Sequence, residues 1–330
     1  MILVVEICVP NVIEIRGLTK TFGPKLAVKN LELNIPERSL YAFIGPNGAG
    51  KTTTIRLIMS ILFADKGEVS VLGKKSALES KDRIGYLPEE RGVYRKMKVG
   101  AFLGYIGRLK GIDGAAADKA AKDWLERIEL KGVHSKKCEE LSKGMQQKVQ
   151  FVAAVIHNPD LIILDEVFSG LDPVNRRLIR RLIDEQHAAG KTLIFSTHAM
   201  YEAEQLCDRV FMIHKGVKVL DDRLEDVWRN HDPRTIIVEP LAGLAHDALA
   251  RVDGVQSVRP LEGGFEVTVN DGVAPASCLA SIAAAAPMRR VELRRPTLED
   301  VFVKLVGGDA EALRNEAAEL GGSSGRGGES

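Results

Sequence analysis

Apolar positions along this chain fall into short continuous runs that alternate with stretches of helical periodicity. The runs are LYAFIG, IGYL, LIILD and TLIFST, at residues 40–45, 84–87, 161–165 and 192–197. Helical patterns follow two of them, at 52–62 and 173–190, and Gly190 closes the second at a C′ position. Apolar runs of this length, separated by helices, predict βαβ units around a buried, mostly parallel sheet.

The pattern changes twice along the chain, and the changes predict its division into domains. Between about 95 and 140 it becomes mainly helical, which predicts a helical subdomain. After RNHDP at 229–233, strand and helix patterns follow in the order β-α-β-β-α-β, which predicts a small ferredoxin-like α+β domain. The predicted parts are an N-terminal extension at 1–12, a large α/β domain at 13–230, the small domain at 235–306 and a flexible tail at 307–330.

Composition narrows the function classes. The 46 Lys and Arg residues balance 45 Asp and Glu, so the surface as a whole has no electrostatic reason to coat nucleic acid or an anionic membrane. The four cysteines form no CxxC pair, which argues against a zinc site or a disulfide framework and fits a reducing cytosol. No run reaches the ~18 apolar residues of a spanning helix. We therefore expect a soluble, cytosolic chain, in which residues 1–11 are either an added strand or precede the true start.

The segment GPNGAGKTT at 45–53 satisfies the pattern G-x-x-x-x-G-K-[ST] and lies between a predicted strand and a predicted helix. Its glycines let the backbone turn tightly, so that N–H groups face phosphate oxygens at the positive end of the helix. Lys51 would reach the β- and γ-phosphates, and Thr52 would bind Mg²⁺. An ordinary glycine turn is the alternative, but the flanking strand and helix favour a phosphate loop.

Two carboxylates emerge at the end of the apolar run LIILDE at 161–166. In an open α/β sheet, the carboxyl ends of the strands face the ligand. Asp165 is therefore placed to hold Mg²⁺ through water, and Glu166 to orient or deprotonate the water that attacks the γ-phosphate. A polar strand end at a turn is the simpler explanation, but the accompanying phosphate loop favours the metal and base roles.

Residues from about 13 to 230 resemble the nucleotide-binding subunit of ATP-binding-cassette (ABC) transporters, because these two motifs stand among others in that family's order. GPNGAGKTT is similar to the Walker A loop and LIILDE to Walker B. Taken alone, Phe22 in KTFG fits a core position, and His198 in FSTH fits a polar residue at a strand end. Together with the other motifs, Phe22 resembles the family's adenine-stacking aromatic residue and His198 resembles its switch histidine. The remaining matches are IGYLPEE at 84–90 to the Q-loop, LSKGMQQK at 141–148 to the signature and SGLD at 169–172 to the D-loop.

The resemblance implies an α/β P-loop NTPase fold of the ABC ATPase type, with ATP and Mg²⁺ as cofactors. It implies Glu166 and His198 as catalytic residues. Metal contacts are implied for Thr52, Glu89 and Asp165. The implied nucleotide-binding residues are Phe22, Gly45, Pro46, Asn47, Gly48, Ala49, Gly50, Lys51, Thr52, Thr53, Ser142, Gly144 and Asp172, of which Ser142 and Gly144 act in trans, on ATP bound to the other subunit of a head-to-tail dimer.

The chain departs from the family pattern at three places. In the Q-loop, Glu89 replaces Gln; it still offers an oxygen to Mg²⁺ but adds a negative charge near the phosphates. After Walker B, Val167 replaces Pro and removes no catalytic atom. In the signature, Lys143 and Met145 replace Gly and Gln. Loss of the glycine's backbone freedom at Lys143 is expected to affect geometry and rate, but not the identity of the site.

The favoured function is an ATPase subunit that powers a separate integral membrane permease from the cytoplasmic face of the membrane, as a homodimer or with a paralogue. RPTLEDVFVKLVG at 295–307 resembles the closing segment of export-type systems. A soluble ABC ATPase acting on nucleic acid or ribosomes is disfavoured by the single cassette, the charge near zero and the lack of sustained heptads. A non-hydrolytic regulatory paralogue is the third alternative. Basic residues at 91–110 fit a permease-docking face and a solvated face equally well.

Overall fold

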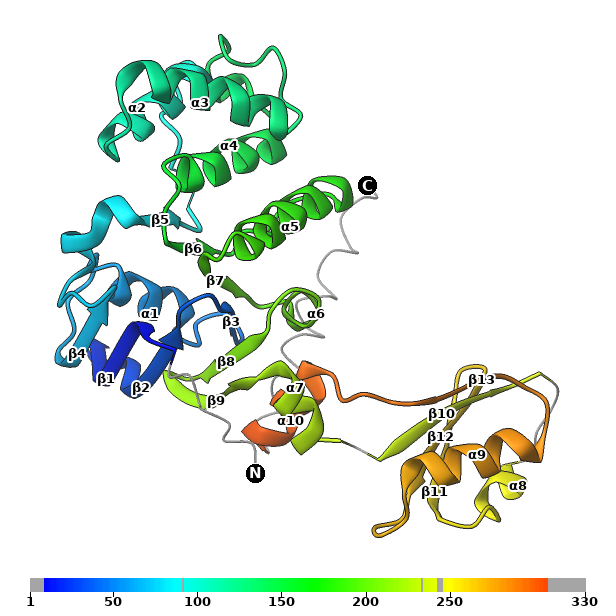
Figure 1. Cartoon of the computed structure of the whole chain (residues 1–330). Helices are drawn as coiled ribbons and strands as arrows, with labels where there is room; N and C mark the ends of the chain where they lie inside the picture. Colours follow the sequence, from blue (N-terminus) through cyan, green and yellow to red (C-terminus); the bar gives the residue numbers. More distant parts are fainter. Residues whose placement is uncertain (1–8, 91, 233, 242–245, 308–330) are drawn as a thin grey trace, which may run out of the picture. The chain divides into compact units, whose positions relative to one another are not determined.

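The computed structural model describes residues 9–90, 92–232, 234–241 and 246–307 (Figure 1). Contacts divide the chain into two compact units, the first ending at Leu224 and the second beginning at Glu225. The predicted N-terminal extension lies outside the described residues up to residue 8, and the predicted tail lies outside them from residue 308 onward.

A six-stranded sheet forms the centre of the first unit's described part. Its order is β5-β6-β7-β3-β8-β9, and neighbours are parallel except for β9, which runs antiparallel to β8. Every residue of β3, β6 and β7 is buried, which explains their continuous apolar sequences. The predicted mostly parallel sheet is confirmed. The strands are β3 Leu40–Ile44, β5 Ile84–Leu87, β6 Leu161–Asp165, β7 Thr192–Thr197, β8 Arg209–His214 and β9 Val217–Arg223.

A second, antiparallel sheet of three strands was not predicted from the apolar runs. Its order is β2-β1-β4. Ile13 and Leu31 of this sheet join Phe43 of the central sheet in one hydrophobic cluster. The turn between β1 and β2 brings Phe22 and Lys25 to the edge of the cavity described below. The strands are β1 Asn11–Phe22, β2 Lys25–Pro36 and β4 Lys66–Val71.

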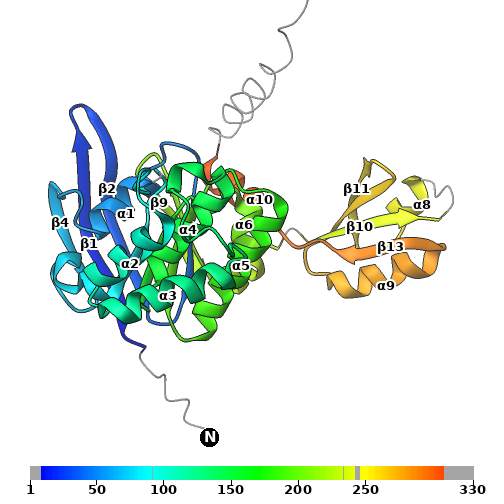
Figure 2. The same cartoon turned by 90° about the horizontal axis from the view of Figure 1, so that it is seen from above.

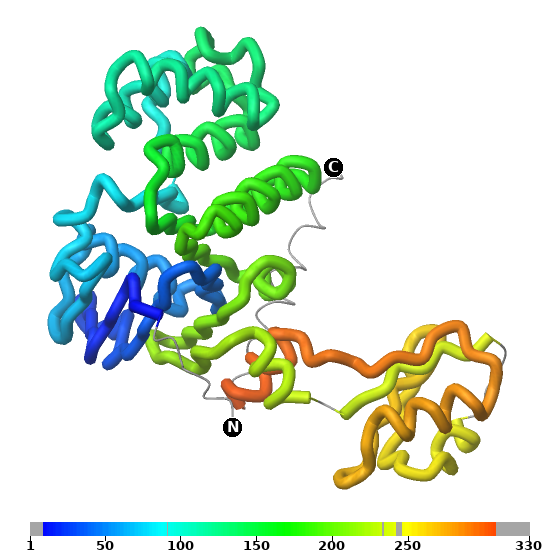
Figure 3. The backbone as a smooth tube through the Cα atoms, viewed as in Figure 1, coloured from blue at the N-terminus to red at the C-terminus, as the bar shows by residue number. Residues whose placement is uncertain are grey.

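The helices of the first unit lie beside the sheets or form a separate group of α2, α3 and α4, which the backbone trace shows clearly (Figure 3). Helix α1 ends at Ile58, before the predicted end at 62, because Ser60 adopts a left-handed backbone with φ of 54°. In the described ranges, no helix is long and apolar enough to cross a membrane. The helices are α1 Lys51–Ile58, η1 Ala77–Arg83, α2 Val99–Leu109, α3 Gly114–Arg127, η2 Cys138–Glu140, α4 Lys143–Val155, α5 Pro173–Ala188 and α6 Met200–Glu204.

The second unit contains an antiparallel sheet of order β11-β12-β10-β13 (Figure 2). Its elements from β10 to β13 follow one another as strand, helix, strand, strand, helix, strand, which is the predicted order. The elements are α7 Leu224–Asn230, β10 Thr235–Pro240, α8 His246–Ala250, β11 Val255–Leu261, β12 Gly264–Val269, α9 Pro275–Ala285, β13 Met288–Leu293 and α10 Leu298–Val306.

This second sheet has its own hydrophobic core. Leu249 of α8 and Ile282 of α9 are buried against Ile236 and neighbouring residues of the sheet. The two flanking segments also meet, because the Arg295 guanidinium lies 5.3 Å from the centroid of the Trp228 ring. The chain therefore enters and leaves the sheet at neighbouring points.

Candidate functional site

The loop from β3 to α1 has a backbone that requires glycine at two positions. Gly45 has a φ of 154°, and a Cβ atom there would lie 2.2 Å from the carbonyl oxygen of Ile213. Gly50 has a φ of 115°, and its Cβ would lie 2.7 Å from the carbonyl oxygen of Ala27. A larger residue at either position would push these segments apart. The glycines thus allow the close approach that sets Lys51 at the start of α1.

Lys51 is buried, with 6% exposure, inside the loop that it terminates. Its Nζ donates to the carbonyl oxygens of Gly45 and Pro46, at 2.8 and 3.2 Å, and lies 3.7 Å from Glu166 Oε1. Burial lowers the pKa of Lys51, and the charges of Glu166 and Asp165 oppose that shift. A buried ammonium with these partners is ready to bind phosphate oxygens, which offer stronger charge-assisted hydrogen bonds than carbonyl groups.

The two carboxylates at the end of β6 are fixed by a residue of the adjacent strand. Parallel pairing of β6 and β7 sets Asp165 opposite Ser196. Ser196 Oγ donates to Asp165 Oδ1 and accepts from the Glu166 N–H at 2.9 Å. Asp165 is fully buried, and burial raises the pKa of its carboxyl against the hydrogen bonds from Ser196 and Thr52. One hydroxyl group therefore orders both acidic residues.

Glu166 lies between a lysine and a histidine. His198 Nδ1 is 3.0 Å from Glu166 Oε2, while Lys51 approaches the other oxygen. The backbone of Glu166 has a φ of 49°, in the left-handed region that residues other than glycine rarely occupy. Strain of this kind clusters at functional sites, where surrounding contacts hold it in place. The arrangement gives Glu166 one fixed orientation at the strand end.

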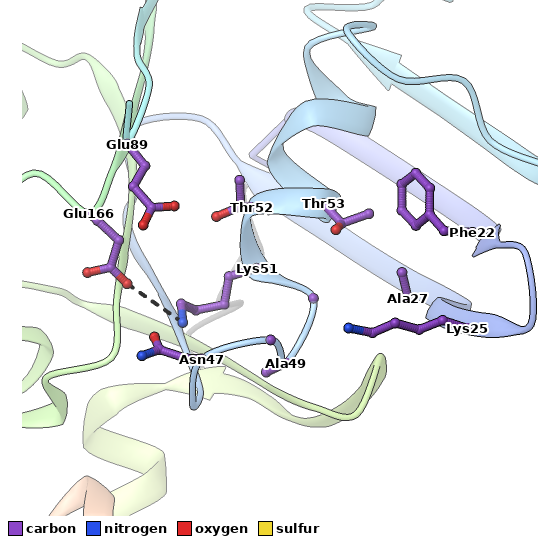
Figure 4. A pocket seen from close by; sticks show the side chains of 12 residues that line it. Phe22, Lys25, Ala27, Asn47, Ala49, Lys51, Thr52, Thr53, Glu89 and Glu166 are labelled. Atoms are coloured by element: carbon purple, nitrogen blue, oxygen red, sulfur yellow. Dashed lines mark ion pairs between the residues drawn. The ribbon is translucent and has the colours of Figure 1, made fainter. Parts of the chain in front are cut away.

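A cavity of about 500 Å³ opens beside these groups. Figure 4 shows the Lys51–Glu166 ion pair on one side of it, and Phe22 and Lys25 on the other. Phe22 is 46% exposed, so its ring offers an aromatic surface at the rim. An exposed ring and a phosphate loop at opposite ends of one cavity suit a nucleotide. The predicted residues that line the cavity are Phe22, Asn47, Gly48, Ala49, Gly50, Lys51, Thr52, Thr53, Glu89 and Glu166.

Oxygen atoms suited to a divalent cation border this cavity. Thr52 Oγ1 donates to Asp165 Oδ1 at 3.3 Å, whereas Asp165 Oδ2 has no hydrogen-bond partner in the described part of the chain. Glu89 lines the same cavity. A buried carboxylate oxygen without a partner, beside a hydroxyl, fits Mg²⁺ or its bound water. Among the residues described, no three His, Cys, Asp or Glu side chains are grouped so as to hold a metal ion together.

The signature and D-loop residues do not line this cavity. Ser142 is the N-cap of α4, where its Oγ accepts from the Met145 N–H at 3.3 Å, and Gly144 lies in the first turn. Asp172 caps α5 and accepts from the Asn175 N–H at 2.9 Å. This hydrogen bond is the main reason that the pKa of Asp172 is lowered. These residues occupy helix N-termini outside the chain's own nucleotide cavity.

The conformation of the signature does not need glycine at position 143. Lys143 is the first residue of α4 and has a helical backbone, which any residue adopts. The expected loss of backbone freedom therefore has no conformational cost here. Gly144 is the more tightly packed position, because a Cβ there would lie 3.2 Å from Asn175 Nδ2, and the Asn175 side chain would have to shift slightly to accept it.

Two residues of the site were missed by motif reasoning. Ser196 belongs to the run TLIFST, and pairing this run with LIILD in parallel would have set it beside Asp165. Lys25 follows the turn after Phe22 and lines the cavity. The alternating pattern of β1 and β2 was the available signal for that hairpin.

Comparison with protein families finds three matching models, one of which, described as "AAA domain, putative AbiEii toxin, Type IV TA system", covers only residues 137–204. Another, described as "ABC transporter", matches residues 28–169, and the third, described as "ATP-binding protein DrrA1-3-like, C-terminal domain", matches residues 223–306.

Two similar curated proteins align over most of this chain. "Uncharacterized ABC transporter ATP-binding protein YhaQ" of Bacillus subtilis (strain 168) is 38% identical over 290 residues, which cover 88% of this chain and 97% of that protein. "Nod factor export ATP-binding protein I" of Bradyrhizobium diazoefficiens is 30% identical over 305 residues, 91% of this chain and 97% of that protein.

Solved structures with the same fold align over about two thirds of this chain. "Structure of ATP binding subunit of ABC transporter" is 28% identical with a TM-score of 0.62, and covers 66% of this chain and 92% of that one. "Dimeric structure of a post-hydrolysis state of the ATP-binding cassette MJ0796 bound to ADP and Pi" is 24% identical with a TM-score of 0.59, over 64% of this chain and 98% of that one. At 24% identity, the similarity to the second structure is a similarity of fold alone.

Proposed function

The chain belongs to the ATP-binding subunits of ABC transporters, and from that premise we propose that it hydrolyses ATP in the cavity beside Lys51 to power export through a separate membrane permease. The observation that carries the proposal is the position of Glu166. Its carboxylate lines the same cavity as the phosphate loop, with Lys51 and His198 on either side.

In the proposed reaction, the residues of the phosphate loop bind the phosphates of ATP, and the residues at the strand ends activate the attacking water. Lys51 and the N–H groups at the start of α1 hold the phosphates. Glu166 accepts the proton of the attacking water, and His198 keeps the carboxylate oriented. The left-handed backbone of Glu166 fixes the direction of its side chain.

We further propose that Mg²⁺ is held by Thr52, Asp165 and Glu89 together with the phosphates. When bound, the ion neutralises negative charge on the transferring group. The unpartnered Asp165 Oδ2 supports this role, because a buried acceptor without a hydrogen bond is otherwise costly.

We place the second half of each site on another copy of the chain, or on a paralogue, in a head-to-tail dimer. Ser142 and Gly144 stand at the positive end of α4 but outside their own cavity, so they are available to ATP bound elsewhere. The Ser142 hydroxyl already accepts one hydrogen bond and still has an O–H to donate. Asp172, as the cap of α5, holds the D-loop in position for the same interface.

A permease partner and a location at the inner face of the cell membrane complete the proposal. The printed names of two relatives, "Nod factor export ATP-binding protein I" and "Linearmycin resistance ATP-binding protein LnrL", support export as the direction. In this proposal the membrane-spanning pathway belongs to the permease, and the chain supplies the energy of ATP hydrolysis.

Replacing Glu166 by Gln tests the proposal. The amide keeps the shape of the side chain but cannot accept the proton, so turnover should fall by roughly 10²- to 10⁴-fold. Affinity for ATP should be retained, because the loop is unchanged. Phosphate release and fluorescent-nucleotide titration measure the two quantities.

Glu299→Gln is the matched control, since Glu299 is an exposed carboxylate of the second unit, on α10. It should hydrolyse ATP at the unaltered rate. Near-normal hydrolysis by the Glu166→Gln variant would show that Glu166 is not the base.

A further inference from the structure

The sheet of the second unit has two edge strands, β11 and β13, among the described residues (Figure 2). β11 is a poor template for another strand, because Pro260 has no N–H and a register shift interrupts its pairing between Val255 and Ser257. β13 contains no proline, and its pairing with β10 keeps one register from Arg290 to Leu293. β13 therefore presents an open edge that is regular from Arg290 to Leu293, after a register shift between Met288 and Arg290.

Alternate residues of β13 direct their backbone groups to this edge. The Arg294 N–H donates to the first residue of β10 at 2.7 Å, and the antiparallel ladder alternates from there. Glu292 and Arg290 consequently bond to β10, whereas the N–H and C=O groups of Val291 and Leu293 point away from it. These groups have no partner within the sheet and are available to another strand.

We propose that β13 pairs antiparallel with β13 of a second copy of this chain, about a twofold axis at Val291, to join the two sheets into one. Arg290 then lies opposite Glu292 of the partner subunit, and Glu292 lies opposite the partner's Arg290. Opposite charges directly across an antiparallel pair stabilise it. Both side chains project on the sheet face that carries Glu239, where Arg290 contacts Glu239 at 3.3 Å and is also hydrogen-bonded to Glu292 of its own chain. In the dimer each of these charges would gain a second partner across the strand pair.

The charge pattern selects this register among the symmetric ones. An axis at Arg290 would bring two arginines together, and an axis at Glu292 would bring two glutamates together. Like charges directly opposite are destabilising. An axis between two residues would oppose side chains from different faces, which the pleat does not allow. An axis at Leu293 would also oppose unlike charges, Glu292 and Arg294, but Arg294 lies beyond the end of β13 and is already paired with Glu266 and Asp300. The axis at Val291 is therefore the one within β13 that satisfies both the charges and the pleat.

The helix-covered face favours the same register. Leu293 is apolar and yet 45% exposed at the edge, while Val291 packs against the core of the second unit. In the proposed pairing, Leu293 lies opposite the partner's Arg289 and diagonal to the partner's Val291. The apolar surface of Leu293 is then partly covered by a valine and by the aliphatic stem of an arginine.

Mixed-cysteine cross-linking of the full-length chain tests the register. Arg290→Cys and Glu292→Cys proteins are mixed without nucleotide and oxidised. Opposed residues of a non-hydrogen-bonded pair have Cα atoms about 4.5 Å apart, within the range of about 4.4–6.8 Å that a disulfide spans. The mixture also keeps one Arg–Glu pair intact. We expect a covalent dimer in several-fold higher yield than from either variant alone.

Ser257→Cys mixed with Arg259→Cys is the matched control on the blocked strand β11, and it should give no dimer above background. A β13 mixture that cross-links no better than its separate components, or no better than this control, would overturn the proposal. A strand from another polypeptide would then be the remaining occupant of the edge.

Charge reversal gives an independent test in the same chain. Glu292→Arg should raise the dimer dissociation constant in sedimentation experiments without nucleotide by about tenfold or more. The double variant Arg290→Glu/Glu292→Arg should restore association, because the charges are exchanged but still complementary. Thermal melting of each variant shows whether the sheet is folded. Equal association of folded single and double variants would refute the pairing, and that result would leave the proposed ATPase function untouched.

Discussion

The two units of the chain treat charge in opposite ways. The first buries Lys51, Asp165 and Glu166, at 6%, 0% and 8% exposure. In the described part of the second, Thr235 is the only buried residue that is polar or charged. The charged side chains of the second sheet, such as Arg290 and Glu239, pair at the surface instead.

This difference in burial matches a difference in role: the buried charges of the first unit serve the proposed chemistry, and the surface charges of the second unit serve the proposed contact with another strand. Removing a charge from water costs several kcal/mol even after the protein relaxes. The first unit carries that cost where phosphate and metal would offset it. Exposed pairs contribute little to stability because water screens them. They can still fix the register of a neighbouring strand, which is the role that we propose for β13.

The largest effect is expected from Lys51→Ala, which removes one of the buried charges of the first unit. Removing one partner of a buried charge pair typically costs about 2–5 kcal/mol in binding free energy. Affinity for ATP should fall accordingly in a fluorescent-nucleotide titration. Lys304→Ala, on α10 of the second unit, removes an exposed lysine that is not among the residues lining the cavity, and this variant should bind ATP normally. Unchanged affinity in the Lys51 variant would contradict the assigned loop.

A core substitution in the second unit should have a smaller effect that stays within it. Ile236 is fully buried in the second sheet's own cluster. Ile236→Val removes one methylene group and should cost about 0.5–1.5 kcal/mol of unfolding free energy. Calorimetry should show a lower melting temperature for the second unit with ATP hydrolysis by the first unit retained. A shift of both transitions together would mean that the units unfold as one.

Acid should act on the first unit through His157. Its Nε2 lies 3.1 Å from the Ile84 carbonyl oxygen, and burial, helped by the nearby charge of Lys110, lowers the pKa of His157 to about 4. The folded pKa lies below the unfolded one, so this stability is fully present above about pH 6.5 and is lost as the pH falls towards 4.

We expect the first unit to lose about 1 kcal/mol between pH 7 and pH 5 from this group, after allowance for its partial exposure. Thermal melts across that range measure the loss. A His157→Gln variant, which cannot be protonated, should show a flatter pH dependence. The same slope in both proteins would exclude His157 as the cause.

The smallest effect is expected from Arg294→Ala. Arg294 contacts Glu266 at 2.7 Å and Asp300 at 2.9 Å, with about a third of its side chain exposed. Exposed pairs of this kind are worth about 0.2–1 kcal/mol. Urea unfolding should detect only a slight decrease, and a loss of several kcal/mol would mean that the second unit depends on surface charge after all.

Local sequence patterns were sufficient to predict structure where the interacting elements follow one another directly along the chain. The apolar runs of the central sheet and GPNGAGKTT predicted both their structures and the position of Lys51, because strand, turn and helix follow one another directly. The roles of individual site residues remain predictions that the proposed variants test.

Features that depend on distant segments were not visible in those patterns. The sheet β2-β1-β4 requires Ile13 to pair with Val71, and such long-range pairing leaves only an alternation of polar and apolar residues. Ser196 acquires its role only from the strand beside it. The early end of α1 depends on the left-handed backbone of Ser60. Serine is not a residue type from which this conformation could be predicted.

The contact between Trp228 and Arg295 bears on the history of the chain. Because the segments before and after the second sheet meet there, the 235–293 stretch begins and ends at nearly the same point. A single insertion could have added it, and a single deletion could remove it, with only a short turn needed to rejoin the flanking helices. The sheet could therefore be exchanged as one module while the segments that flank it stay together.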